Sequence, residues 1–82
     1  MYLHLGYSTV LPFEEIIGVF DLDSVSASRR TQEFLERAED HGELTDIGRG
    51  LPASLVVSDW ASYLSPVRSA TLAKRMAQDK WE

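Results

Sequence analysis

The feature that most constrains this chain is that it has 82 residues and no cysteine. A chain of this length buries only about 60–65% of its unfolded surface, so a lone monomer is marginally stable. Small domains commonly offset this with disulfides or a thiolate-bound zinc ion, and both need cysteine. Association with further copies is the remaining common way to bury more surface. The length therefore predicts a single domain, residues 1–82, that assembles into a homo-oligomer.

The charge balance narrows the range of partners. The chain has 13 acidic against 8 basic side chains, which gives a formal net charge of −5. This argues against a protein that coats DNA through a general basic surface, because phosphate neutralisation needs clustered Lys and Arg. Residues 1–25 contain four acidic and no basic side chains, whereas residues 51–82 contain three acidic and four basic ones. An acidic front and a mildly basic tail favour head-to-tail packing of identical subunits, and separate solvated faces are the alternative interpretation.

The sequence shows no pattern of a signal peptide or of a membrane-spanning segment. Its start lacks the basic region and the long apolar core of a signal peptide. The longest apolar stretch, residues 16–20, is far below the roughly 20 residues that span a bilayer. We therefore expect a cytoplasmic protein with no membrane partner.

Apolar alternation predicts an α+β fold with a small, mostly antiparallel sheet of about five short strands and two helices. The strand patterns cover residues 2–5, 16–20, 44–47, 55–57 and 60–64, and residues 9–11 continue an extended path. Pro12 then opens one helical turn. Gly18 marks a bulge or a close backbone approach inside its strand. The last two strand patterns flank a short turn and predict a hairpin.

The two helices have recognisable ends. The first is expected to start after Ser28 as N-cap and to stop at Gly42, with His41 in its last turn. Its predicted buried stripe consists of Thr31, Phe34, Leu35 and Ala38. The second is expected to begin near Ser69, and its predicted buried stripe consists of Leu72, Ala73 and Met76.

The residues that carry chemistry do not form a catalytic or metal-binding pattern. The histidines are His4 in a strand and His41 at a helix end, and neither lies in a nucleophile motif or at metal-ligand spacing. Glu14 and Glu15 are adjacent and point apart, so they do not pair for acid–base work. We therefore expect no enzyme activity, no metal and no cofactor.

Three arginines are candidates for nucleic-acid binding. Arg29 and Arg30 stand at the start of the first helix, where free N–H groups help to seat a phosphate. Arg49 lies between two glycines, which allow its backbone to approach DNA closely. Simple exposure to solvent is the alternative for Arg29 and Arg30. One copy has few cations, but an oligomer that repeats them adds many weak contacts to double-stranded DNA.

Three aromatic residues are candidates for the oligomer interface, because aromatic side chains are enriched at interfaces. They are Trp60, Tyr63 and Trp81. A place in the core is the alternative for each of them.

The sequence resembles the RemB branch of the RemA/RemB family, small bacterial regulators of extracellular matrix (biofilm) genes. The resemblance rests on MYLHLG at residues 1–6 and SPVRSATLAKR at residues 65–75. Between them, HGEL at residues 41–44, Asp46, a glycine loop and LVV at residues 55–57 follow in a similar order and spacing.

This resemblance implies a small sheet with two helices, a ring-forming homo-oligomer and, for RemA, DNA binding that activates matrix genes. Two positions depart from the RemA pattern. RemA proteins have an arginine pair where this chain has Leu51 and Pro52, and a basic residue about where it has Glu15. Glutamate inverts the charge at a phosphate contact, and proline has no N–H to donate. The scaffold is therefore expected to carry over, while the RemA-type DNA site does not carry over intact.

Two functional hypotheses follow. The first is a non-enzymatic regulator of matrix gene expression that acts as a ring-like homo-oligomer, with any DNA contact through Arg49, Arg29 and Arg30. The second is a protein-interaction scaffold without DNA binding, which pairs with a RemA-like partner whose basic surface complements its acidic face.

Overall fold

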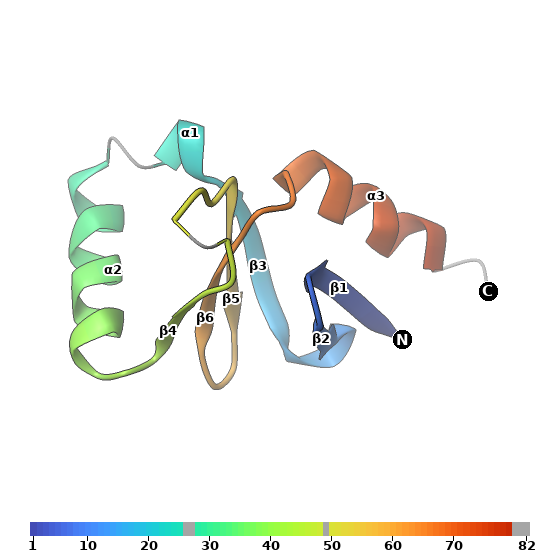
Figure 1. The fold of residues 1–82 in the computed structure, drawn as a ribbon, viewed down its shortest axis with the longest axis horizontal. Helices are drawn as coiled ribbons and strands as arrows, with labels where there is room; N and C mark the ends of the chain where they lie inside the picture. Colours follow the sequence, from blue (N-terminus) through green and yellow to red (C-terminus); the bar gives the residue numbers. More distant parts are fainter. Residues whose placement is uncertain (26–27, 49, 80–82) are drawn as a thin grey trace.

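A computed structural model describes residues 1–25, 28–48 and 50–79 of the chain (Figure 1). In chain order the elements are β1 (Tyr2–Gly6), β2 (Thr9–Pro12), the 3-10 turn η1 (Phe13–Glu15), β3 (Ile16–Asp21), α1 (Leu22–Val25), α2 (Arg29–Asp40), β4 (Leu44–Asp46), β5 (Ser54–Ser58), β6 (Ser62–Ser65) and α3 (Ser69–Asp79). The α+β class is thus confirmed, with two long helices and the single-turn α1. No helix among the described residues is long and apolar enough to cross a bilayer.

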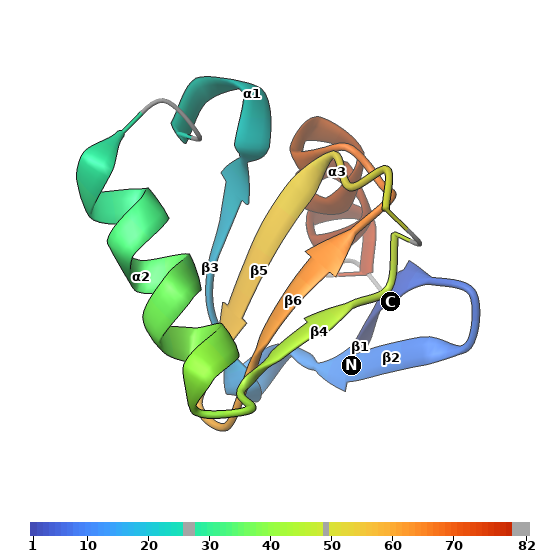
Figure 2. The same ribbon diagram turned by 60° about the vertical axis from the view of Figure 1, so that its left-hand side comes forward.

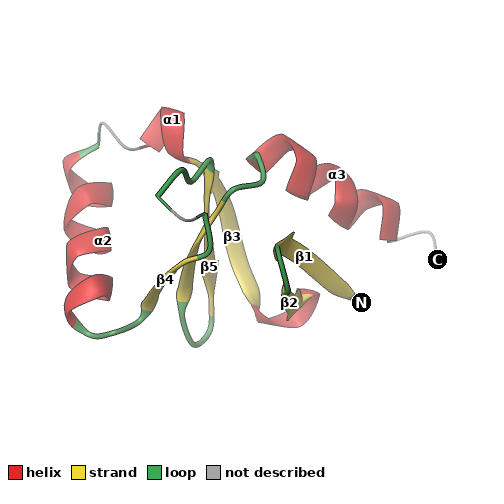
Figure 3. Ribbon diagram, in the orientation of Figure 1, coloured by secondary structure: helices red, strands yellow, loops and turns green. Residues whose placement is uncertain are grey.

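The strands form two sheets, which corrects the expectation of one sheet of about five strands. A four-stranded sheet has the order β3-β5-β6-β4, and β1 pairs with β2 in a separate hairpin. The pairings are antiparallel except for β4 with β6, which is parallel. Pro12 and the turn η1 cause the division, because they interrupt the extended chain between β2 and β3 (Figure 3). The predicted hairpin of the last two strands is confirmed as β5–β6.

The core lies between the β1–β2 hairpin, α3 and one face of the four-stranded sheet. Leu3 and Leu5 alternate with exposed neighbours along β1 and point into this core. Val56 is fully buried at the centre of β5, and Leu72 is fully buried on α3. The buried cluster consists of Leu3, Leu5, Leu11, Ile47, Val56 and Leu72. Figure 1 shows the hairpin and α3 together on this side of the sheet.

Buried serine hydroxyls fasten the hairpin and the α3 connection to the sheet. The Ser65 hydroxyl donates to the backbone oxygen of Leu5 and accepts from the N–H of Val67 at 3.1 Å. The Ser54 hydroxyl donates to the backbone oxygen of Val67 at 2.7 Å. These bonds satisfy polar groups that are otherwise costly to bury. They therefore tie three segments that are far apart in the sequence.

Helix α2 has the ends that its sequence predicts. The Ser28 hydroxyl accepts from the N–H of Thr31 at 3.5 Å, and Gly42 has a left-handed backbone with φ +70°. His41 is the C-cap, and its Nδ1 lies 2.7 Å from the backbone oxygen of Arg37. The predicted stripe is buried only in part, because Ala38 is buried while Phe34 stays exposed. This helix therefore does not close against the sheet along its whole length.

Helix α3 begins at Ser69 as predicted, and its buried stripe is narrower than predicted. Leu72 is buried and Met76 packs against the core, since residues four apart share a helix face. Ala73 is exposed, so that part of the prediction was wrong. The next residue along a helix is rotated by about 100°, which turns Ala73 away from the hairpin.

The serine contacts give a test of how the hairpin is held. We expect Ser65→Ala to lower the free energy of unfolding by about 1–3 kcal/mol, because it leaves the backbone groups of Leu5 and Val67 without their partner. Thr71→Ala on the exposed side of α3 is the control and should change it by less than about 0.5 kcal/mol. Urea unfolding at one protein concentration measures both. Equal, small effects of the two changes would contradict this role of Ser65.

Candidate functional site: a groove between α2 and the sheet

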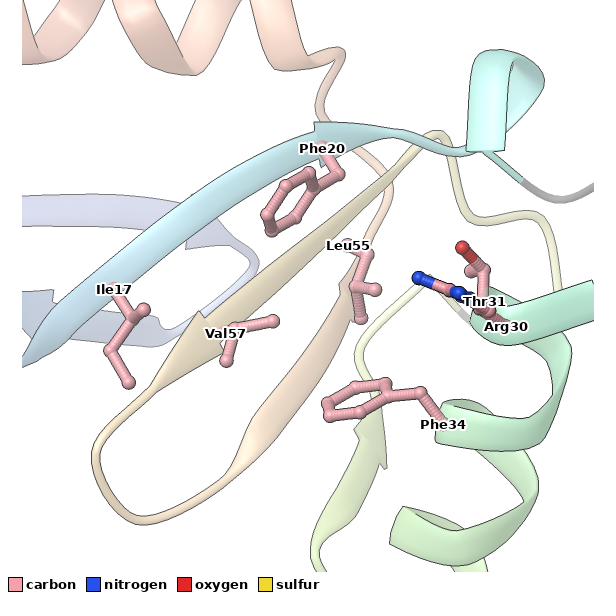
Figure 4. A pocket seen from close by; sticks show the side chains of 7 residues that line it. All are labelled: Ile17, Phe20, Arg30, Thr31, Phe34, Leu55 and Val57. Carbon is pink, nitrogen blue, oxygen red and sulfur yellow. The ribbon is translucent and has the colours of Figure 1, made fainter. Parts of the chain in front are cut away.

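The second face of the four-stranded sheet carries an open apolar groove. Helix α2 crosses this face, and the space between them has a volume of about 330 Å³. The lining residues are Ile17, Phe20, Arg30, Thr31, Phe34, Leu55 and Val57. Figure 4 shows side chains from β3 and β5 on one wall and Phe34 of α2 across from them. The groove is a built feature of the fold, because its walls come from three separate elements.

A bulge in β3 shapes the sheet side of this groove. Ile16 pairs with Ser58 and Gly18 pairs with Val57, so Ile17 has no partner across the strand pair. The side chain of Ile17 lines the groove and is 68% exposed. The predicted bulge at this glycine is thereby confirmed. Its effect is to place a large apolar side chain on the surface.

Gly18 also packs against the side-chain ring of Phe20, two residues along the same strand. A Cβ atom on Gly18 would stand 2.9 Å from two ring carbons of Phe20, closer than real Cβ contacts come. The absence of a side chain at Gly18 therefore allows the Phe20 ring to lie flat along the groove. Phe20 is itself exposed, so this arrangement shapes a surface.

A second cleft continues the groove toward the β5–β6 turn. It has a volume of about 460 Å³ and shares Phe34 and Val57 with the first. Its walls include Trp60, which is 78% exposed, and the polar side chains of Arg37 and His41. The two clefts together form a surface that is mainly apolar in the groove and has both apolar and charged side chains near the β5–β6 turn.

The structure describes two of the three predicted DNA-binding arginines. Arg29 and Arg30 are exposed in the first turn of α2, and Arg30 also lines the groove. Arg49 lies outside the described residues. Its neighbours Gly48 and Gly50 follow β4, which is one edge strand of the four-stranded sheet. Helix α2 begins near β3, which is the other edge strand (Figure 2).

The positions that depart from the RemA pattern are visible in the structure. Leu51 is 84% exposed in the glycine loop, beside Pro52. Glu15 is half-buried at the end of η1, and its backbone oxygen accepts from the N–H of Asp59 at 2.9 Å. None of these three positions itself carries a cationic side chain.

The remaining titratable candidates stay apart from one another. His4 is exposed on the hairpin, and Glu14 is exposed on η1. Within residues 1–25, 28–48 and 50–79, no group of three His, Asp or Glu side chains could hold a metal ion. The lining of the groove is apolar except for Arg30 and Thr31.

Comparison with known proteins places the chain among regulators. A family model described as "Extracellular matrix regulatory protein A-like" matches residues 2–76. The chain belongs to this RemA-like family. The resemblance seen in the end motifs and the central block is thus confirmed, and the family is one of extracellular matrix regulatory proteins.

Individual relatives of this RemA-like chain support the same assignment. It is 37% identical over 75 residues to extracellular matrix regulatory protein B of Bacillus subtilis (strain 168), covering 92% of this chain and 89% of that protein. It is 31% identical over 77 residues to putative regulatory proteins of Bacillus cytotoxicus and Bacillus cereus, covering 92% of this chain and 84% of each relative.

The predicted interface aromatics of this RemA-like chain have different surroundings. Trp60 is exposed at the β5–β6 turn, so it is available to a partner. Tyr63 is half-buried and packs against the core. Trp81 lies outside the described residues. The groove residues Ile17 and Phe20 were not predicted as functional from the sequence, although residues 16–20 contain more apolar side chains than one buried strand face needs.

The contact between Gly18 and Phe20 predicts a specific coupling. We expect Gly18→Ala to leave the free energy of unfolding nearly unchanged, because displacing the exposed Phe20 ring offsets the preference for alanine over glycine inside a strand. In a Phe20→Ala background the same change should stabilise the fold by about 0.5–1 kcal/mol, since only the preference for alanine remains. A double-mutant cycle by urea unfolding measures the difference. The same effect in both backgrounds would contradict the contact.

Proposed function

We propose that this chain is a non-enzymatic regulator of extracellular matrix (biofilm) gene expression that acts as a ring-like homo-oligomer. Membership of the RemA-like family supports the regulatory role. The observation that carries the oligomer is the open groove, which leaves Ile17, Phe20 and Phe34 exposed on one surface.

A small chain gains stability when such an apolar surface is covered by another copy. Burial of apolar surface contributes about 25 cal/mol per Å². Contiguous apolar patches of several hundred Å² mark interaction sites on soluble proteins. The chain has no cysteine to supply a covalent or thiolate-bound constraint instead. Association of copies would therefore add the buried apolar surface that a chain of this length lacks.

DNA contact in this proposal depends on repetition. Arg29 and Arg30 are exposed at the start of α2, where the helix dipole favours an anion. Together with Arg49, they give each copy a few cations, and a ring multiplies weak contacts along a duplex. The substitutions at Glu15, Leu51 and Pro52 limit how many phosphates each copy can neutralise.

The charge of the chain favours a second candidate function, a scaffold that does not touch DNA. The net charge of −5 complements a basic partner such as a RemA-like protein. Residues 29–43, which include α2, contain three arginines against five carboxylates. In this alternative the acidic surface binds the partner, and the partner binds DNA.

One experiment separates the two. The mass of the chain in solution is measured first, and fluorescence anisotropy then follows its binding to a labelled duplex across a salt series. The proposal predicts a mass several times the 9.2 kDa of one copy and DNA affinity that falls log-linearly with salt concentration. Arg29→Ala/Arg30→Ala and Arg49→Ala should each weaken binding and flatten the salt slope.

The control variant is Arg37→Ala, whose exposed side chain lies on the same helix, α2. It removes a cation outside the candidate set. An oligomer that binds no DNA at low salt, yet binds a basic RemA-like protein, would favour the scaffold. A 9.2 kDa monomer at high concentration would contradict the ring in both forms.

A further inference from the structure

The groove between α2 and the sheet has a polar end. Arg30 and Thr31 lie in the first turn of α2, and their side chains reach the groove near Leu55 (Figure 4). The other described residues that line the groove are apolar, and none of them is a carboxylate. Arg30 is therefore the charged group that a molecule in this groove meets.

The apolar part of the groove extends away from Arg30 along β3 and β5. Phe20 lies opposite Leu55 across this strand pair, and Ile17 lies at the far end of the groove (Figure 4). Three residues of strand span about 10 Å, which is the distance along β3 from Phe20 to Ile17. The groove thus has a cation at one end and an apolar path of about 10 Å beyond it.

This arrangement matches a molecule with a carboxylate head and an alkyl chain. A guanidinium binds a carboxylate through two parallel hydrogen bonds, and a threonine hydroxyl adds a further donor. The groove volume of about 330 Å³ lies at the lower end of the roughly 300–1,000 Å³ of small-molecule sites, so it suits a chain of medium length.

We propose that the groove binds a medium-chain fatty acid, with its carboxylate on Arg30 and Thr31 and its alkyl chain along Phe20, Phe34 and Ile17. The net charge of −5 opposes the approach of an anion, and Glu33 is the carboxylate nearest to Arg30 in the sequence. Glu33 is exposed and does not line the groove. Burial of the alkyl chain therefore supplies most of the affinity, and Arg30 selects the head group.

Binding of this ligand also regulates association, a step that rests on the proposed homo-oligomer. The exposed side chains of Ile17, Phe20 and Phe34 are the ones that a neighbouring copy covers in that proposal. They cannot contact an alkyl chain and a second copy at once. A fatty acid that binds single copies therefore shifts the equilibrium away from the oligomer by mass action.

Isothermal titration calorimetry with decanoate, below the concentration at which it forms micelles, tests the binding site. Decanoate should bind saturably at one site per copy. Octanoate should bind about tenfold more weakly, because it buries two fewer methylene groups. Decyltrimethylammonium, which has the same chain and a cationic head, should bind more weakly than decanoate. No saturable binding of decanoate would overturn the site while leaving the homo-oligomer standing.

Three variants test the residues of the site, and circular dichroism checks that each is folded. Arg30→Ala should raise the Kd for decanoate about threefold to fivefold, since an exposed ion pair contributes modestly, and leave the Kd for decanol unchanged. Arg37→Ala is the matched control, because Arg37 is an exposed arginine of α2 that does not line the groove. Phe34→Ala should weaken decanoate and decanol alike, and Ile17→Ala replaces it if it does not fold. Equal effects of Arg30→Ala and Arg37→Ala would overturn the head-group assignment.

Analytical ultracentrifugation tests the coupling to association. Increasing decanoate should lower the mass of an oligomeric wild type toward 9.2 kDa, whereas decyltrimethylammonium at the same concentrations should leave it higher. An oligomer that binds decanoate and keeps its mass at saturation would overturn the regulation but not the site. A wild type that is monomeric at every concentration yet binds decanoate would instead overturn the proposed homo-oligomer.

Discussion

The packing of the β1–β2 hairpin and α3 against one face of the four-stranded sheet is the interaction on which the rest of the structure depends. It buries Leu3, Leu5, Val56 and Leu72 in a single cluster. Ser65 reinforces it by joining β6 to β1. In a chain of 82 residues, most of the large buried apolar side chains are packed on this one face of the sheet. The opposite face is therefore left with α2 and an open groove.

Local signals in the sequence predicted the local structure well. Ser28, His41 and Gly42 mark the ends of α2 because capping depends on a few adjacent residues. The β5–β6 hairpin follows from two strand patterns on either side of a short turn. The division into two sheets and the parallel pairing of β4 with β6 were not predicted, because they depend on contacts between distant segments. A parallel pair has no turn between its strands that a sequence pattern could reveal.

The candidate site was predicted only in part for the same reason. Arg29 and Arg30 were placed correctly at the start of α2, since that position follows from the cap. The groove was missed, because it requires knowing that Phe34 stays exposed while Ala38 on the same helix is buried. Residues 16–20 did indicate an exposed apolar surface, because a strand that is covered on one face cannot bury consecutive apolar side chains on both faces. The net charge of −5 is spread along the chain, since residues 1–25 contain four carboxylates and no cation and residues 29–43 contain five carboxylates against three arginines.

The central claim is that the apolar groove left open by this one-sided core is covered when copies of the chain associate. The most direct measurement is the mass of the wild type and of Ile17→Asp by analytical ultracentrifugation at one concentration, because Ile17 lines the groove and is exposed in one copy. We expect a wild-type mass several times 9.2 kDa and a mass near that of one copy for a folded Ile17→Asp protein. A wild type that stays monomeric, or an Ile17→Asp oligomer of wild-type mass, would contradict this claim.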